Sequence, residues 1–480
     1  MSPMAEKSMN PLRLLSFLIA ISLFLLTISS FSLLHFDTKY FIPKSVLQLI
    51  LINNITSDNW NSSTTRAETE MPLLPNSSKK PNRVCEGRNQ TILRVYMYDL
   101  PPEFHFGLLG WKGSRNDKIW PDVDEPSKIP RYPGGLNLQH SIEYWLTLDL
   151  LLSNTYYTPT VFSRPCTAVR VRNSTEADVI FVPFFASLSY NRHSKVQNDG
   201  EISKDRLLQH RVVEFLKSRD EWKRFGGRDH LVVAHHPNSM LFARKKLGSA
   251  MFVLADFGRY PAEIANIGKD VIAPYRHMVK TIDAGISRPF KQRPILVYFQ
   301  GEIYRKDGGA IRQDLYYLLK DEKDVHFTFG STQSNGIRSA SQGMASSKFC
   351  LNIAGDTPSS NRLFDSIVSH CVPVIISDDI ELPYEDVLDY SEFCIFVRAS
   401  DALREGYLLS VLRGIQEEKW TKMWERLKEI TIHFEYQYPS QPNDAVDMIW
   451  QAVSRKKYSI QLKTNRDNRY HRSELFLKSQ

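Results

Sequence analysis

Zinc-binding and redox cysteine motifs are missing from this chain. Its 480 residues hold five cysteines, and no two of them form a CxxC pair: Cys85, Cys166, Cys350, Cys371 and Cys394. Zinc sites and thiol–disulfide motifs use closely spaced cysteines, so the sequence favours neither class. The chain also lacks an RNP motif, a helix lined with lysine and arginine, and an internal repeat. We therefore expect no nucleic-acid partner, although the formal charge is +8.

The basic excess is modest and dispersed along the chain, with a pI near 9.0. Such an excess suits a nucleotide diphosphate or an acidic polysaccharide better than it suits nucleic acid. The length and the hydrophobic content of 42% are enough for two or three domains with cores of their own.

Charged residues are absent from residues 14–34, while Lys7 and Arg13 precede them. At ~1.5 Å per residue in a helix, this run spans ~30 Å, the thickness of a bilayer core. A cleavable signal peptide is the alternative, but its apolar core is usually shorter and ends in an A-x-A-like site, which is not evident here. We expect a cytosolic tail over residues 1–13 and an uncleaved signal anchor over residues 14–34.

Residues 35–91 are rich in Asn, Ser, Thr and Pro and show no helical periodicity. We interpret them as a glycosylated lumenal stem, because N-x-S/T triplets are crowded into this polar segment just beyond the anchor. The predicted glycosylation sites are Asn54, Asn61, Asn76 and Asn89, with a fifth further on at Asn173.

Short apolar runs alternate with amphipathic helices from Leu93 onward, which predicts an α/β fold with doubly wound parallel sheets. A basic hinge with two prolines, Ile286–Arg293 and the following Pro294, divides two such series. The expected domains are residues 92–290, residues 291–435, and a C-terminal helix over Ala445–Ser454 with a basic tail within residues 436–480.

The segment Ser346–Glu385 predicts a strand, a turn, a helix and a second strand. Ser359, Ser360 and Asn361 are N-cap residue types at the turn. Backbone N–H groups at such a helix start bind anions, and Arg362 adds a permanent cation in the first turn. Asp365, one turn later, is placed to accept the hydroxyls of a ribose. The alternative is an ordinary capped helix whose arginine and aspartate lie on the surface.

The same segment, KFCLNIAGDTPSSNRLFDSIVSHCVPVIISDDIELPYED, resembles the signature of the exostosin family, glycosyltransferase family 47, and is most similar to its plant arabinan arabinosyltransferase-like group. The similarity runs from about Leu93 to Trp450. One departure is Asp365, where many members carry Glu. The blocks that agree in order include RVYMYDLP, EADVIFVPFFASLS, GRDHLVVAHHP and FQGEIYRKDGGAIRQDL.

The resemblance implies a GT-B fold, in which two Rossmann-like domains face a cleft, with the acceptor domain first and the nucleotide-sugar domain second. It also implies a type II Golgi anchor and inverting transfer from a UDP-sugar. The donor-binding residues that it implies are Gly301, Arg305, Arg312, Ser359, Ser360, Arg362 and Asp365. Taken alone, Arg305 also fits a solvated surface cation.

An inverting transferase needs a base that removes the proton of the acceptor hydroxyl. By position after strands of the first domain, Asp256, His235, His236 and Asp99 qualify, with Asp256 preferred; a structural role is the alternative for each. Asp122-Val123-Asp124 spells the D-x-D of metal-dependent transferases, but no apolar strand precedes it, so we interpret it as a loop. We expect no metal or other cofactor, with arginines and helix N–H groups stabilising the leaving group.

These features predict a Golgi glycosyltransferase that extends a plant cell-wall polysaccharide such as pectic arabinan, using a sugar such as arabinose. The alternative is a non-catalytic partner of the same fold that binds polysaccharide or anchors an active relative; complexes with related glycosyltransferases fit both. We also expect a lumenal disulfide between Cys85 and Cys166, with Cys350, Cys371 and Cys394 as buried free thiols.

Overall fold

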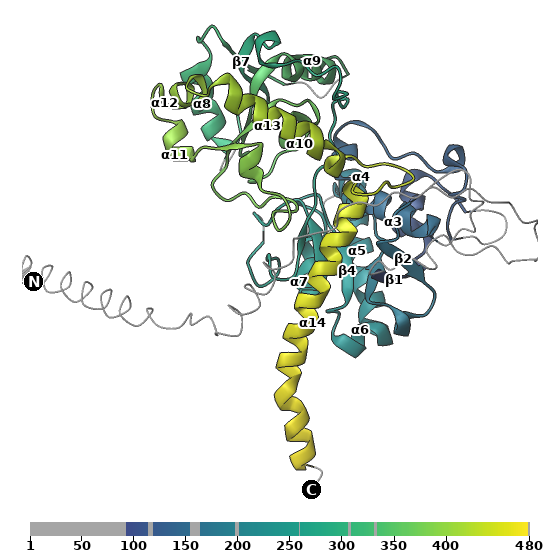
Figure 1. The fold of residues 1–480 in the computed structure, drawn as a ribbon. Coiled ribbons are helices and arrows are strands. Elements are labelled where there is room, and N and C mark those ends of the chain that lie inside the picture. The colour runs from purple at the N-terminus through teal and green to yellow at the C-terminus, as the bar shows by residue number, and fades with distance from the viewer. Residues whose placement is uncertain are drawn as a thin grey trace, which may run out of the picture. The chain divides into compact units, whose positions relative to one another are not determined.

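The computed structural model describes residues 93–113, 119–153, 164–196, 201–258, 260–305, 309–330 and 334–478 (Figure 1). The predicted tail, anchor and stem, with their four sequons, lie outside the described residues. Among the residues that are described, no helix is both long and apolar enough to cross a membrane. Asn173 is described, and its exposed side chain accepts a hydrogen bond from the Thr175 N–H at 3.0 Å.

A first sheet of six parallel strands occupies the N-terminal half of the described chain, in the order β2-β1-β3-β4-β5-β6. All residues of β3, β4 and β5 are buried, because helices and loops cover both faces of a parallel sheet. The strands are β1 Leu93–Met97, β2 Ala168–Val171, β3 Val179–Val182, β4 His230–Val233, β5 Met251–Leu254 and β6 Val271–Ile272.

The helices of this half are α3 Ile142–Leu152, α4 Ala186–His193, α5 Lys204–Ser218, α6 Asp220–Phe225 and α7 Leu241–Lys246. A separate 3-10 helix over Gly135–His140 precedes α3. Gly135 adopts a φ of +62°, which only glycine takes without strain.

A second sheet of five parallel strands follows, in the order β11-β10-β9-β7-β8. Its strands are β7 Ile295–Gly301, β8 Val325–Phe329, β9 Ser347–Ile353, β10 Val372–Ile376 and β11 Ile395–Phe396. Its helices are α8 Ile311–Leu319, α9 Ser334–Ala345, α10 Asn361–Val368, α11 Ala399–Ala402, α12 Tyr407–Arg413 and α13 Glu417–Ile430. The predicted α/β class with two parallel sheets is confirmed.

Each sheet reverses its direction of growth between its first and third strands. In the second sheet, β8 lies on one side of β7, and β9, β10 and β11 follow on the other side. The loops that leave β7 and β9 therefore diverge and open a crevice beyond the carboxyl ends of these strands. Ligands of doubly wound sheets bind at this switch point.

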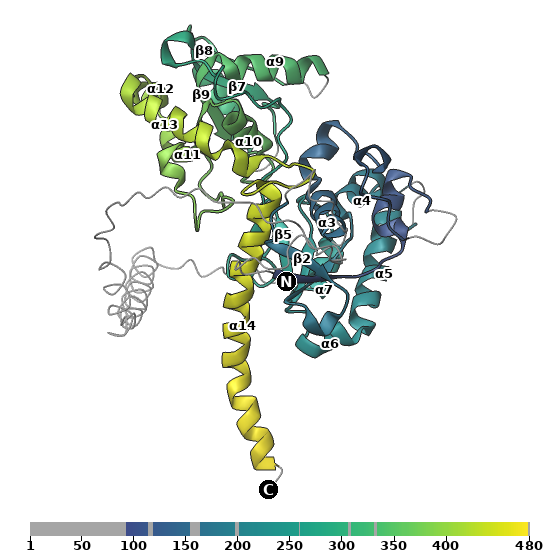
Figure 2. The ribbon, with the colours of Figure 1, turned by 45° about the vertical axis from the view of Figure 1, so that its right-hand side comes forward.

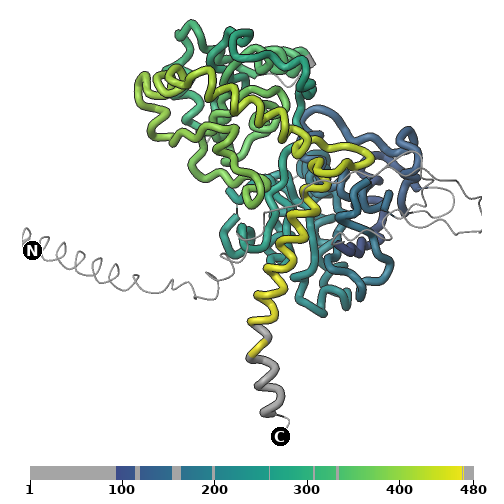
Figure 3. The backbone as a smooth tube through the Cα atoms, viewed as in Figure 1, coloured from purple at the N-terminus to yellow at the C-terminus, as the bar shows by residue number. Residues whose placement is uncertain are grey.

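The chain returns to the first sheet after α13, as the tube in Figure 3 shows. Helix α14, Ala445–Lys478, contacts β6 and α3, and it lies beside the first sheet in Figures 1 and 2. The predicted stop near Ser454 is wrong: the helix runs on through the basic segment. No glycine or proline occurs between residues 445 and 478, so nothing in the sequence ends the helix earlier.

A buried carboxylate fastens this returning segment. Asp149 of α3 is 3% exposed and forms an ion pair of 2.7 Å with Arg164, which is also buried. The same carboxylate accepts hydrogen bonds from Ser440 at 2.5 Å and from the indole N–H of Trp450 at 3.0 Å. The Asp149 carboxylate thus joins α3 to residues 291 and 301 positions later in the chain.

The predicted free thiols are wrong for two of three cysteines. Cys350 and Cys371 form a disulfide with Cα atoms 5.8 Å apart. The reason is register: Cys350 lies opposite Pro373 of the neighbouring strand β10, and Cys371 directly precedes that strand. Cys394 is free and buried, as predicted. Cys166 is disulfide-bonded, but Cys85 lies outside the described residues, so the pairing of Cys85 with Cys166 stays a prediction.

We expect Asp149→Asn to destabilise the fold by roughly 3 kcal/mol, because Arg164 would keep a buried charge without its partner. Asp386→Asn is the matched control: Asp386 pairs with Arg455 of α14 at the surface, where such pairs contribute up to about 1 kcal/mol. Denaturant unfolding of the purified full chain measures both. Equal losses in the two variants would contradict the role of Asp149.

Glu143 of α3 gives a pH-dependent prediction. It is fully buried, and its carboxyl accepts bonds from the N–H and hydroxyl of Ser187 at 3.1 and 3.3 Å. Burial raises its pKa to about 8, so the folded state holds this proton more tightly than the unfolded state does. The contribution of Glu143 to stability therefore falls as pH rises from about 4 to about 8.

Glu143→Gln, which mimics the protonated acid, should be close to wild type in unfolding free energy at pH 5 and more stable than wild type at pH 8. Glu263→Gln, a change at an exposed position, is the control and should show no such divergence. A wild-type advantage that grows with pH would contradict the assignment.

Candidate functional site

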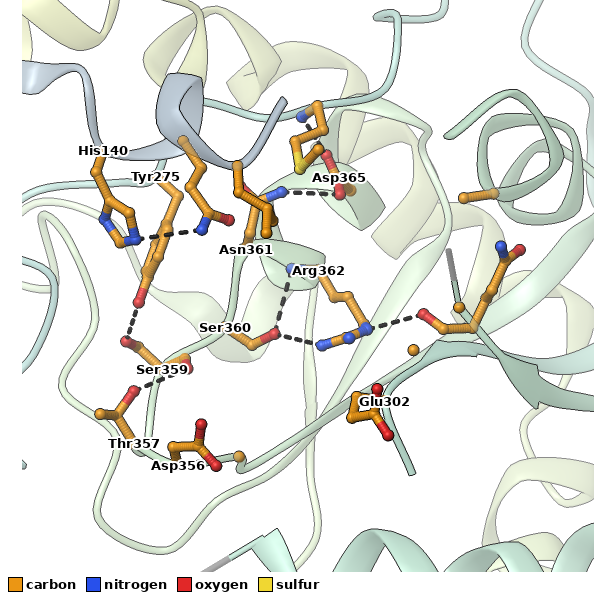
Figure 4. A pocket seen from close by; sticks show the side chains of 18 of the residues that line it. His140, Tyr275, Glu302, Asp356, Thr357, Ser359, Ser360, Asn361, Arg362 and Asp365 are labelled. Carbon is orange, nitrogen blue, oxygen red and sulfur yellow. Dashed lines mark hydrogen bonds between the residues drawn. The ribbon is translucent and has the colours of Figure 1, made fainter. Parts of the chain in front are cut away.

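A cleft of about 520 Å³ opens at the switch point of the second sheet, beyond the carboxyl ends of β7 and β9 (Figure 4). Side chains from both halves of the described chain line it. The first half contributes the segments around His140, His236 and Tyr275. The second half contributes all seven predicted donor-site residues. They come from the end of β7 and the loop after it, from the loop after β9, from α10 and, for Arg312, from α8. The structure therefore brings all seven predicted residues together in one cleft: Gly301, Arg305, Arg312, Ser359, Ser360, Arg362 and Asp365.

Helix α10 starts where the sequence predicts. Ser360 is the N-cap, with φ −149° and ψ 140°, and its hydroxyl accepts a hydrogen bond from the Arg362 N–H. The apolar residues Leu363, Phe364, Ile367 and Val368 are all buried, which holds the helix against the sheet. The first turn of α10 consequently faces the cleft.

Arg362 extends from this first turn across the end of β7. Its Nε donates to the Gln300 carbonyl at 2.9 Å, and Nη1 donates to the Ser360 hydroxyl at 2.9 Å. Its guanidinium carbon lies 5.0 Å from the centre of the Phe299 ring. Burial lowers its pKa to about 10, so it stays charged at neutral pH. None of the ion pairs among the described residues includes Arg362.

Gly301 makes room for this guanidinium. A Cβ atom at Gly301 would lie 2.1 Å from Nη2 of Arg362, a distance that no real side chain tolerates. Any other residue at the end of β7 would therefore displace the arginine from the cleft. The predicted donor residue Gly301 acts here through its lack of a side chain.

Arg312 donates hydrogen bonds to the backbone around the cleft. Its guanidinium, 3% exposed, donates to the carbonyls of Ala354 at 2.9 Å, Glu302 at 3.1 Å and Ile353 at 2.8 Å. It thereby joins the loops that leave β7 and β9. Burial lowers its pKa to about 9, with Arg362 and Arg305 adding to the effect.

Arg305 differs from the other two arginines because it has an acidic partner. It pairs with Asp356 at 2.9 Å, and both side chains are partly exposed. The cleft floor therefore holds Arg312 and Arg362, whose described partners are neutral acceptors, with one compensated pair at its edge. Glu302 and Asp365 also line the cleft, so its carboxylates equal its arginines in number. Arg362 and the N–H groups at the start of α10 still place positive charge at one point, where an anion is stabilised.

Asp365 accepts three hydrogen bonds. Its Oδ1 accepts hydrogen bonds from the backbone N–H groups of Met278 and Val279 at 2.6 and 3.2 Å. Its Oδ2 accepts one from the Asn361 side-chain amide at 3.0 Å. Burial raises its pKa. Asp365 thus links α10 to the segment after β6, a contact that no sequence pattern indicated. Its assignment to a ribose stays a prediction.

The two histidines predicted as bases occupy different environments. His235 is fully buried between His140 Nδ1 at 2.8 Å and the Ala273 carbonyl at 3.1 Å, and burial lowers its pKa to about 3. His236 lines the cleft, and its Nδ1 accepts the Asn238 N–H at 3.1 Å. A neutral ring that accepts at Nδ1 carries its proton on Nε2, so it presents a donor there.

Asp99 and Asp256 are not among the residues that line the cleft. Asp99 instead pairs with Arg170 at 2.7 Å and accepts the Trp120 indole N–H at 2.7 Å. Asp256 accepts the Gly258 N–H at 3.1 Å and a hydrogen bond from the Ser359 hydroxyl. The base itself stays unassigned, because no contact favours one of these groups.

The Asp122-Val123-Asp124 segment is a loop, as predicted, and its first carboxylate accepts the Asp124 N–H at 3.1 Å. Within the described part of the chain, no group of three or more His, Cys, Asp or Glu side chains could hold a metal ion.

Sequence reasoning missed the contribution of Tyr275. It follows β6 and lines the cleft, its hydroxyl lies 2.8 Å from Ser359 Oγ, and its ring stacks on Phe364 of α10 at 5.7 Å between centroids. Its position after the short strand β6, which the pattern also missed, is a signal that could have indicated it.

Sequence comparisons find known glycosyltransferases that are similar to this chain. The model of the Exostosin GT47 domain matches residues 89–413. The chain is 39% identical to "Probable arabinosyltransferase ARAD1" of Arabidopsis thaliana over 82% of this chain and 87% of that protein. It is 24% identical to "Probable glucuronosyltransferase GUT1" of Oryza sativa subsp. japonica over 76% of this chain and 81% of that protein.

Among solved structures, "Crystal Structure of TarM" matches 66% of this chain and 58% of that one at 10% identity, with a TM-score of 0.27, too low to support an argument. The family assignment rests on the matched domain and on the 39% identical relative. The chain belongs to the exostosin family of glycosyltransferases, glycosyltransferase family 47.

Proposed function

We propose that this glycosyltransferase moves arabinose from a UDP-linked donor to a plant cell-wall polysaccharide such as pectic arabinan. The observation that carries the donor half of the proposal is Arg362 at the start of α10, which neutral hydrogen-bond acceptors hold inside a cleft lined from both halves. The sugar rests on the similarity to a probable arabinosyltransferase. The acceptor rests on the sequence resemblance to the plant arabinan arabinosyltransferase-like group.

The donor diphosphate would lie at the first turn of α10. Arg362 and Ser360 face the cleft there, and the N–H groups of the turn add partial positive charge. Arg305 would reach a phosphate oxygen by exchanging its surface contact with Asp356. Arg312 would act indirectly, by keeping the loops after β7 and β9 together. Asp365 would meet the ribose on the same helix face.

Departure of UDP builds negative charge on the bridging phosphate oxygen, and the transferase must stabilise it. Arg362 and the α10 N–H groups supply fixed positive charge at that place, so we propose that transfer needs no metal ion. We also propose inversion at the anomeric carbon, with the acceptor entering from the half that carries His140, His236 and Tyr275.

We propose further that the enzyme is a single-pass type II Golgi protein of the GT-B class. The charge-free residues 14–34 and the sequon-rich residues 35–91 support this topology. Assembly with related glycosyltransferases is compatible with it.

Arg362→Ala should lower the transfer rate about a hundredfold, equal to roughly 3 kcal/mol of lost transition-state stabilisation, as for the loss of one oxyanion donor. Arg362→Lys should recover part of this, because lysine keeps the charge without the planar fork. Arg413→Ala is the control, since Arg413 pairs at the surface with Glu322 and Asp324. The measurement is transfer from UDP-arabinose to an arabinan oligosaccharide. Full activity in Arg362→Ala would contradict the donor site.

Transfer should persist in excess EDTA, within about twofold of the rate in Mg²⁺ or Mn²⁺, because Arg362 and the helix start already stabilise the leaving group. The assay uses the full chain stripped of metal and then resupplied. A loss of more than about tenfold in EDTA that Mn²⁺ restores would contradict metal-independent transfer.

A further inference from the structure

The hydroxyl of Ser359 lies between two side chains of the other half of the chain. Tyr275, which follows β6, places its hydroxyl 2.8 Å from Ser359 Oγ. Ser359 Oγ in turn donates to the carboxylate of Asp256, which follows β5. Figure 4 shows Tyr275 and Ser359 meeting above the loop that leads into α10. Three residues from two sheets thus form one hydrogen-bonded chain.

The direction of this chain follows from the donor inventory. A carboxylate has no proton to give, so Ser359 donates its only proton to Asp256 and accepts the proton of Tyr275. Phosphate oxygens are also acceptors. While the chain is closed, Ser359 therefore has no hydrogen left for a diphosphate, in contrast to its neighbour Ser360.

The surroundings of the chain are closely packed. Asp256 and Tyr275 are each 5% exposed. A Cβ atom at Gly258 would lie 2.4 Å from the ring of Pro358, so the turn after Asp256 packs directly on the donor loop. The Tyr275 ring also stacks on Phe364 of α10. Hydrogen bonds between buried groups are stronger than hydrogen bonds in water, so they favour a single position of the loop.

We propose that the Tyr275–Ser359–Asp256 chain fixes the loop of residues 355–360 in the position that binds the donor diphosphate. Ser359 is then a positioning residue and does not bind phosphate. Asp256 accepts its hydrogen bond and does not act as the base. This replaces the sequence-based roles of both residues. The inference rests on the proposed UDP-sugar function.

The experiment compares full-chain variants in two measurements, the Kd for UDP by calorimetry and the KM and kcat for UDP-arabinose. Ser359→Ala should weaken UDP binding about tenfold and raise the donor KM equally, with kcat within about threefold of wild type. A tenfold change corresponds to about 1.4 kcal/mol, within the range of a hydrogen bond to a charged group. Tyr275→Phe, which keeps the ring and removes only the hydroxyl, should show a smaller effect of the same kind.

The decisive pair is Asp256→Asn and Asp256→Ala. The asparagine oxygen still accepts from Ser359, so Asp256→Asn should stay within about threefold of wild type in kcat and Kd, whereas Asp256→Ala should match Ser359→Ala. Ser391→Ala is the matched control and should resemble wild type: the Ser391 hydroxyl also donates to an aspartate, Asp389 at 2.6 Å, but at an exposed site that does not line the cleft.

Two results would overturn the inference alone. One is a wild type that binds UDP no more tightly than Ser359→Ala does. The other is an Asp256→Asn variant that loses kcat more than about a hundredfold with unchanged UDP affinity, as removal of a base would cause. A wild type that neither binds UDP nor transfers from any UDP-sugar would instead overturn the proposed function, and the inference with it.

Discussion

The site depends on two guanidinium groups that the fold holds with neutral acceptors. Arg312 is bonded to three backbone carbonyls, and Arg362 to one carbonyl and one hydroxyl. Carboxylate partners would have cancelled the charge, whereas carbonyls only orient it. The cost is desolvation, which appears as lowered pKa values of about 9 and about 10. An anionic ligand that enters the cleft would offset part of that cost, so the buried arginines favour binding of an anion.

The cleft also needs its two halves kept together. Asp365 takes backbone N–H groups from the segment after β6, and Ser359 is bonded to residues after β5 and β6. Farther away, α14 and the Asp149 cluster return the chain to the first sheet. The carboxylates of Asp149, Asp256 and Asp365 therefore hold the two halves of the chain together, while the arginines line the cleft. This division of charge explains why Asp99 and Asp256, which the sequence offers as candidate bases, have structural partners.

The sequence predicted the local secondary structure well, but it predicted the contacts between distant segments poorly. The strand, turn and helix from Phe349 to Val368 follow from apolar spacing and N-cap residues, whereas Gly301, Arg305 and Arg312 were assigned to the donor site by the family resemblance. Contacts between segments distant in sequence were not predictable in this way: the Cys350–Cys371 bridge depends on strand register, and the bonds of Asp365 and Asp256 depend on how two sheets meet. The continuation of α14 past Ser454 could have been predicted, because no helix-breaking residue follows.

The most direct test of the central claim is a structure of the full chain with bound UDP. The account predicts the β-phosphate at the first turn of α10, with its oxygens within about 3.2 Å of an Arg362 Nη atom and of a backbone N–H of that turn. Arg362 should keep its bond to the Gln300 carbonyl, since that bond aims it into the cleft. A diphosphate bound elsewhere, or an Arg362 turned away from it, would contradict the account.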